Sequence, residues 1–190
     1  ITLKPGEDAL LQPEACGNVE KVLLDAYALQ FHDATITVKE NYLPVDMISY
    51  SKDGIEYSKP WPYAALFQKL LYEKYQGPLY LKYEFDVEDI PRELILRTEK
   101  SNDVAAWLNG HLLEETLPTT ECYVQNYDVT AYVKKGINTF VKQVDWYQNE
   151  MVYFALFGEN VTESLRNCIV YDTELEPIEL IGQFGVYPRN

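Results

Sequence analysis

A strict alternation of apolar and polar residues between positions 79 and 87 limits the chain to folds that contain a sheet with one buried face. The apolar positions are Leu79, Leu81, Tyr83, Phe85 and Val87, and more polar residues stand between them. Successive side chains of a strand point to opposite faces, so this period of two predicts a strand buried on one side only.

Turn signals divide the rest of the chain into further short strands. We expect them at residues 34–38, 47–51, 55–57, 94–96, 104–108, 122–129, 139–146, 151–157 and 178–186. Asp53-Gly54 and Asn109-Gly110 are dipeptides typical of tight hairpin turns. Many short strands separated by turns are typical of an all-β fold, here a mainly antiparallel β-sandwich or jelly roll.

One helix is expected within this β pattern, over residues 62–75. Its apolar positions recur at helical spacing, at Tyr63, Leu66, Phe67, Leu70 and Leu71. Residues 22–31 are apolar without a clear period and fit a strand or a helix. We therefore expect the sandwich over residues 41–190, with residues 1–40 as extra strands or the remnant of a preceding domain.

Charge and cysteine content exclude several kinds of partner. The chain carries 30 acidic and 16 basic residues, a net charge of −14, so nucleic acid and anionic membrane surfaces are not expected partners. Neutral carbohydrates, cations and proteins remain open. The odd count of three cysteines gives no complete disulfide framework. Free, buried thiols are therefore expected, which favours a cytoplasmic location.

Three motifs, in order, resemble a known family. They are Tyr83-Glu84-Phe85, then Trp107-Leu108-Asn109-Gly110, then the segment 128–138 with its Asp-Val-Thr start and Lys-Gly-Ile-Asn end. This order resembles the galactose-binding-like, sugar-binding β-sandwich of glycoside hydrolase family 2. The segments 171–176 and 180–186 resemble the tail of large bacterial proteins of uncharacterised activity that are related to these enzymes.

The resemblance implies an accessory domain, carbohydrate-binding or architectural, of a glycoside-hydrolase-like protein. In the resembled enzymes the catalytic acids lie on a separate barrel domain, so no catalytic residue is expected here, and other domains of the parent chain are expected partners. Two alternatives remain open: an interaction module without a ligand, and a self-contained hydrolase. The acids considered for the latter are Asp86, Glu88, Asp89, Glu114, Glu115, Asp145 and Glu150.

The expected ligand-binding residues are Trp146, Tyr147, Gln148 and Asn149, where one predicted strand ends. Consecutive rings in an extended strand point to opposite faces, so at least one should project outward and stack on a pyranose. The competing interpretation places Trp146 in the core. No metal site or cofactor is predicted, because the two histidines lack ligand spacing, although a structural Ca²⁺ is compatible with the acidic loops.

Overall fold

The computed structural model describes residues 40–114 and 117–187, which form ten strands and three helices. The strands are β1 (Asn41–Val45), β2 (Met47–Ser51), β3 (Trp61–Pro62), β4 (Gly77–Val87), β5 (Leu94–Glu99), β6 (Asp103–Leu108), β7 (His111–Leu112), β8 (Val124–Asp128), β9 (Gly136–Trp146) and β10 (Ile178–Gly182). The helices are α1 (Tyr63–Glu73), α2 (Glu150–Phe157) and α3 (Glu163–Asn167).

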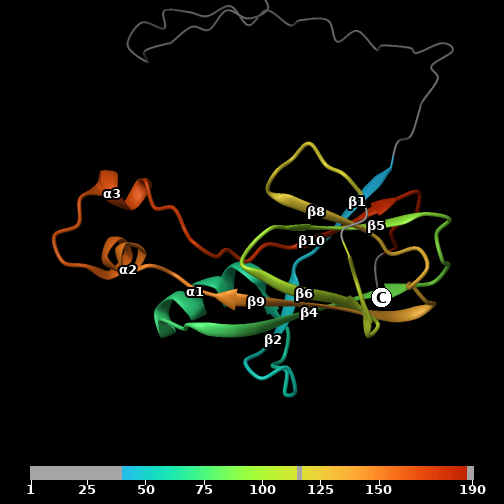
Figure 1. The fold of residues 1–190 in the computed structure, drawn as a ribbon, viewed down its shortest axis with the longest axis horizontal. Coiled ribbons are helices and arrows are strands. Elements are labelled where there is room, and N and C mark those ends of the chain that lie inside the picture. Colours follow the sequence, from blue (N-terminus) through green and yellow to red (C-terminus); the bar gives the residue numbers. More distant parts are fainter. Residues whose placement is uncertain (1–39, 115–116, 188–190) are drawn as a thin grey trace, which may run out of the picture. The chain divides into compact units, whose positions relative to one another are not determined.

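The strands form two sheets that lie in two layers (Figure 1). One sheet has the order β3-β2-β4-β9-β6-β7, and the other has the order β1-β10-β5-β8. Neighbouring strands in both sheets are antiparallel. The prediction of an antiparallel β-sandwich is confirmed.

The core lies between the sheets and is supplied by the alternation seen in the sequence. Along β4, Leu79, Leu81 and Tyr83 are each at most 3% exposed, and the paired strand β9 adds Phe140 and Val144 beside them. The second sheet adds buried residues from β5 and β10, among them Leu94, Leu96, Ile178 and Leu180. The β4–β9 pair runs without a break from Gly77 opposite Trp146 to Val87 opposite Gly136, and forms the centre of the larger sheet.

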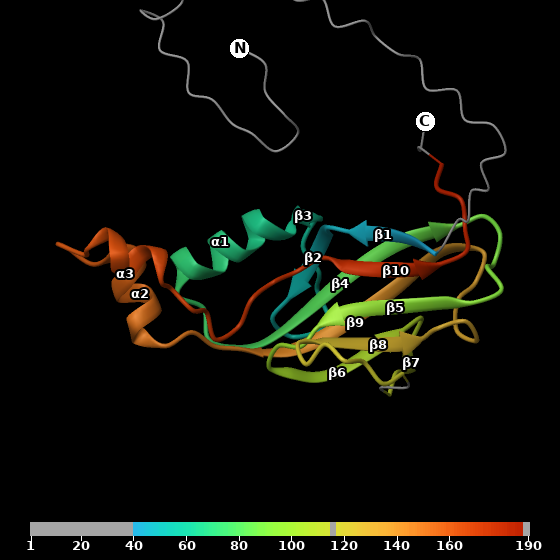
Figure 2. The same ribbon diagram turned by 90° about the horizontal axis from the view of Figure 1, so that it is seen from above.

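The helix expected over residues 62–75 is confirmed as α1, but the described residues form two further helices, α2 and α3, that were not predicted. The buried side of α1 carries Leu66, Leu70 and Leu71. A strand was expected at residues 151–157, and this is wrong, because the segment is helix α2. The Asn149 side chain accepts hydrogen bonds from the backbone N–H groups of Met151 and Val152, and such an N-cap starts a helix. All three helices lie at one end of β4 and β9 (Figure 2).

One of the two predicted hairpins is present. Asn109 and Gly110 have φ angles of 51° and 86°, as a type I′ turn requires, and join β6 to β7. The hairpin expected at Asp53-Gly54, with a strand at residues 55–57, is wrong. The Asp53 carboxylate accepts hydrogen bonds from the N–H groups of Ile55 and Glu56, which holds this segment in a bend. The strand beside β2 is instead β3.

Several expectations fall on other parts of the chain. The strand at 34–38, the apolar segment 22–31 and Cys16 lie outside the described residues, and the division at residue 40 stays a prediction. Cys122 and Cys168 are free but exposed, so the expectation of burial is wrong for both. Among the described helices, none is long and apolar enough to cross a membrane.

Candidate functional site

A cleft of about 480 Å³ opens between the two sheets where β5 ends. Its floor is made by inward-facing side chains of β4 and β9, including Tyr83 and Lys142, and its rim by the end of β5 and segment 171–176. Four acidic residues line it: Glu99, Asp172, Glu174 and Glu176. We call it the acidic cleft.

Lys142, which lines the acidic cleft, belongs to a buried ion pair. The Lys142 side chain projects from β9 toward the four-stranded sheet and is only 5% exposed. Its Nζ lies 2.8 Å from Asp103 Oδ1 and donates hydrogen bonds to Thr98 Oγ1 and to the Glu99 carbonyl oxygen. Burial lowers the pKa of Lys142 and raises the pKa of Asp103, while the attraction between the two charges opposes both shifts. The interior of the sandwich is thus charged at this point, and the charge is compensated.

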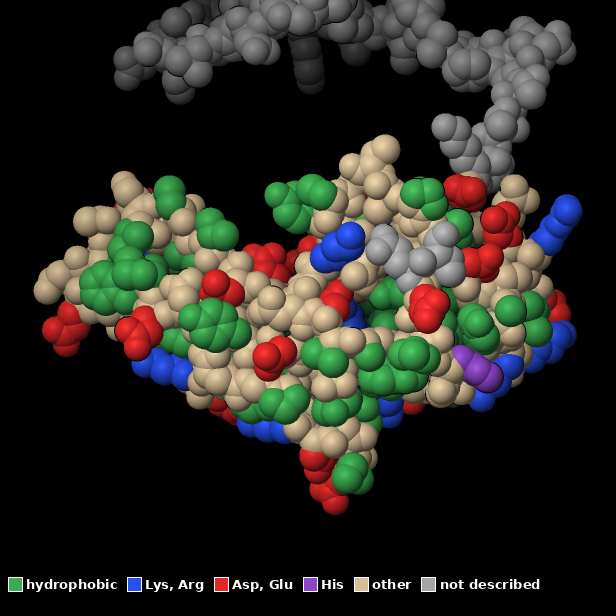
Figure 3. All heavy atoms as spheres, viewed as in Figure 1, with side chains coloured by type: hydrophobic (Ala, Val, Ile, Leu, Met, Phe, Trp, Pro, Cys, Tyr) green, Lys and Arg blue, Asp and Glu red, His purple; other side chains and the backbone are tan. Residues whose placement is uncertain are grey.

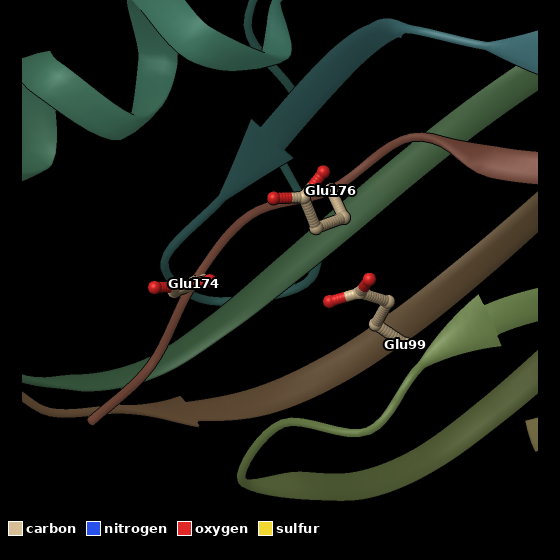
Figure 4. A group of neighbouring side chains, drawn as sticks. All are labelled: Glu99, Glu174 and Glu176. Carbon is tan, nitrogen blue, oxygen red and sulfur yellow. The ribbon is translucent and has the colours of Figure 1, made fainter. Parts of the chain in front are cut away.

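Three glutamates converge on the rim of the acidic cleft. The side chains of Glu99, Glu174 and Glu176 each offer a carboxylate oxygen, and these oxygens lie within 4.8 Å of one another. Figure 4 shows Glu99 at the end of β5 pointing toward Glu176, which lies with Glu174 on the segment that leads into β10. Burial, and then the charge of Glu99, raise the pKa of Glu174 and of Glu176. The carboxyl groups of Glu174 and Glu176 therefore hold a proton more tightly than an isolated glutamate does.

The local sequence explains how two of these glutamates reach one rim. Residues two apart in an extended segment project to the same side, so Glu174 and Glu176 point outward together while Leu175 is buried in the core. The Tyr83 hydroxyl donates a 2.9 Å hydrogen bond to the Glu176 carbonyl oxygen and ties the segment to β4.

The three glutamates have two chemical uses. They supply part of the oxygen shell of a divalent cation, although Ca²⁺ takes about six to eight oxygen ligands. A pair of neighbouring carboxyl groups is also the arrangement that a glycosidase uses for acid–base catalysis. Sequence reasoning missed this group, and the only signal for it was the Glu-Leu-Glu alternation at 174–176. Of the seven hydrolase acids named from the sequence, the six that the structure describes do not line the cleft. Those six are exposed, and Glu115 lies outside the described residues.

The predicted ligand-binding group at residues 146–149 divides between core and surface. Trp146 is fully buried, with the Phe67 ring edge-on at 5.8 Å. Gln148 is 2% exposed and accepts a hydrogen bond from the N–H of Asp172, while Asn149 caps α2. Only Tyr147, at 48% exposed, presents a ring to solvent. One ring does point outward, as alternation required, but the burial of Trp146 and Gln148 leaves them no surface for a sugar.

Comparison with known proteins finds likeness at the level of fold. No protein-family model matches the chain, and no curated protein sequence matches it. Among solved structures, β-glucuronidase from Ruminococcus gnavus matches with a TM-score of 0.50 and 15% identity, covering 82% of this chain and 30% of that chain. The same enzyme in complex with D-glucaro-d-lactam matches with a TM-score of 0.50 and 14% identity, covering 83% and 30%.

The chain has the fold of one part of this enzyme. It spans about 30% of the length of these β-glucuronidase chains. At such low identity the likeness shows the fold alone. The described residues therefore form a β-sandwich of the kind found within a much larger glycoside hydrolase.

Proposed function

We propose that this chain contains an accessory domain, without a catalytic centre of its own, of a larger protein related to glycoside hydrolase family 2. The observation that carries the proposal is that the structural likeness covers most of this chain but only a small part of the larger enzyme. The likeness uses 82–83% of this chain but only 30% of β-glucuronidase, so a sandwich of this kind makes up a minor part of that enzyme. Its contribution is then to bind carbohydrate or to support a neighbouring domain.

The structural work done by the sequence motifs supports a role without catalysis. The buried Asn138 side chain bonds to the backbone of Lys134 and Gly136 and to the side chain of Asn109. Gly136 has a φ of 83°, a conformation that side chains disfavour. Residues of the family-like motifs thus have a folding role.

The outer side of α2 supports contact with a neighbouring domain. Met151, Phe154 and Phe157 project from it and are 59%, 49% and 40% exposed. Hydrophobic side chains gather over the end of the domain that α2 and α3 form (Figure 3). Clustered exposed apolar side chains are typical of surfaces that another domain covers. An architectural role, or an interaction module without a ligand, would use this surface.

The acidic cleft favours a second candidate, a self-contained glycoside hydrolase. Two of its three clustered glutamates have a raised pKa, and a general acid must hold its proton near neutral pH. Against this candidate, Glu99 and Glu174 are both exposed, whereas a raised catalytic pKa usually needs a site closed to water.

One assay separates the two candidates. The purified chain is incubated with a panel of aryl glycosides that includes an aryl β-D-glucuronide, and we expect no release of the aryl group above the blank. Turnover that is abolished by Glu176→Gln or Glu99→Gln would refute the accessory role. The exposed Glu114→Gln is the matched control, and under the hydrolase candidate it would keep the turnover.

A further inference from the structure

A second groove, of about 470 Å³, lies on the outer face of the six-stranded sheet. Tyr80 of β4, Trp107 of β6 and Val141 of β9 all line it. Their chain neighbours, such as Leu81, Leu108 and Phe140, are buried between the sheets, so these three side chains face the other way. We call it the aromatic groove.

Three rings line the aromatic groove from separate parts of the chain. Tyr80 and Trp107 lie on the two strands that flank β9, and Tyr57 comes from the bend after β2. Two strand spacings, about 9.5 Å, separate the β4 and β6 backbones that carry Tyr80 and Trp107, so the groove extends across three strands.

The rings are held in place by their surroundings. A Cβ atom on Gly54 would lie 3.1 Å from the Tyr80 ring, so the backbone of the bend rests directly against it. The Lys82 ammonium lies 5.1 Å from the centre of the Tyr57 ring. Beside Trp107, the turn at Asn109 is fixed by the hydrogen bond from the Thr139 N–H to Asn109 Oδ1. A site that is built before the ligand arrives loses less conformational freedom on binding.

The polar tips of these rings have no partner within the described part of the chain. The hydroxyls of Tyr57 and Tyr80 and the indole N–H of Trp107 make no hydrogen bond there, and thus remain available to a ligand. Burial raises the pKa of Tyr57, with smaller contributions from Tyr80 and Asp53, so its hydroxyl stays protonated and can donate.

Among residues 40–114 and 117–187, no acidic side chain lines the aromatic groove, although the whole chain has 30 acidic residues. Lys134 is the only charged residue of the described part of the chain that lines it. A cation or a basic peptide would find no counter-charge in its walls. Flat apolar faces beside hydroxyl and N–H groups instead match a pyranose, which has an apolar ring face and a rim of hydroxyls.

We propose that the aromatic groove is a carbohydrate-binding site, with Tyr57, Tyr80 and Trp107 as stacking platforms for an oligosaccharide of pyranose units. The choice of carbohydrate rests on the proposed accessory function, while the position of the site rests on the groove itself. It places sugar binding on the outer face of the six-stranded sheet and away from Trp146, Gln148 and Asn149.

The test is a binding titration of the whole chain with cellohexaose, xylohexaose, mannohexaose and an oligogalacturonate at millimolar concentrations. Binding is followed by calorimetry and by the indole N–H resonances of the three tryptophans, with the Trp107 resonance assigned by its loss in Trp107→Phe. We expect at least one probe to bind and to shift the Trp107 resonance. Trp107→Ala should then weaken affinity by about tenfold or more, and Trp107→Phe by less, because a ring remains.

Two matched controls locate the site. Trp61→Ala removes a tryptophan that is 37% exposed in β3, away from the groove, and Tyr147→Ala removes the exposed ring of the 146–149 group. Both should bind as the unaltered chain does. Circular dichroism confirms that each variant is folded, and Tyr80→Ala is a second groove variant should Trp107→Ala fail to fold.

Two results would overturn the inference. The first is that no probe binds, which leaves the accessory role standing as an architectural one. The second is that binding survives in the folded groove variants, in particular if Tyr147→Ala removes it. Glycosidase turnover, by contrast, would refute the proposed function and not the position of this groove.

Discussion

The acidic cleft and the aromatic groove have nearly equal volumes, about 480 and 470 Å³, but opposite chemistry. They lie on opposite faces of the same strands, because β9 places Lys142 in the cleft and its neighbour Val141 in the groove. Between the sheets, the buried charge of Lys142 is balanced by the opposite charge of Asp103. The outer face carries rings at the groove, where Lys134 is the one charged residue of the described chain that lines it. The excess negative charge of the chain is therefore unevenly distributed, and the two regions suit different ligands.

The largest effect is expected from breaking the ion pair beneath the acidic cleft. Asp103→Ala leaves the buried Lys142 ammonium without a counter-charge, and we expect the free energy of unfolding to fall by about 3–5 kcal/mol. Burial already lowers the pKa of Lys142, so the loss should shrink as the pH rises and the amine gives up its proton. Urea unfolding at several pH values measures both effects.

The control for this pair lies in the other region. Lys134 is exposed at the aromatic groove, and Lys134→Ala should change stability by less than about 0.5 kcal/mol. The double variant Lys142→Met with Asp103→Leu should recover most of the loss, because no unpaired charge remains. A loss below about 1 kcal/mol for Asp103→Ala would show that the floor of the cleft does not depend on the pair.

An intermediate effect is expected on the groove side from Asn138→Ala. The Asn138 side chain is fully buried and hydrogen-bonds to backbone groups of Lys134 and Gly136 and to Asn109. Its removal breaks these hydrogen bonds within a buried site, so we expect a loss of about 2–3 kcal/mol and a disturbed Trp107 indole resonance. Thermal unfolding and NMR test this, with the exposed Asn167→Ala as control. An unchanged Trp107 resonance would show that the Asn138 hydrogen bonds do not position Trp107 in the groove.

The smallest effect is expected from Glu176→Gln in the acidic cleft. The pKa of Glu176 is raised above its ordinary value of 4.5, so the folded chain holds this proton more tightly than the unfolded chain. Glu176 therefore contributes most to the free energy of unfolding below pH 4.5, its ordinary pKa. This contribution is lost as the pH rises through the higher pKa of the folded chain. At neutral pH, Glu176→Gln should raise the free energy of unfolding by about 0.2–0.5 kcal/mol.

Melting temperatures from about pH 4 to pH 8 check this sign. The variant and the unaltered chain should converge at the acidic end and separate toward neutral pH. The exposed Glu114→Gln should show no such separation. A destabilised Glu176→Gln at neutral pH would mean that the carboxylate makes a favourable interaction that outweighs the repulsion within the cluster.

The elements found from the sequence are those with a strong local pattern. The period of two in β4, the helical spacing of α1 and the Asn109-Gly110 turn each specify their structure through a few neighbouring residues. Local pattern failed at α2 and at the bend after β2. In both places one side chain, Asn149 or Asp53, captures backbone N–H groups and overrides the β-like composition.

The candidate sites depended on contacts that no local pattern contains. The sequence by itself determined the fold class, and it required Trp146 and Tyr147 to face opposite sides. Only the tertiary structure decided which ring is buried, because that depends on Phe67 of α1 packing against Trp146. The same holds for Glu99 meeting Glu176, and for Tyr57 joining Tyr80 and Trp107. Strand pairing brings together residues that are distant in the chain, and the packing of the two sheets settles which face is buried.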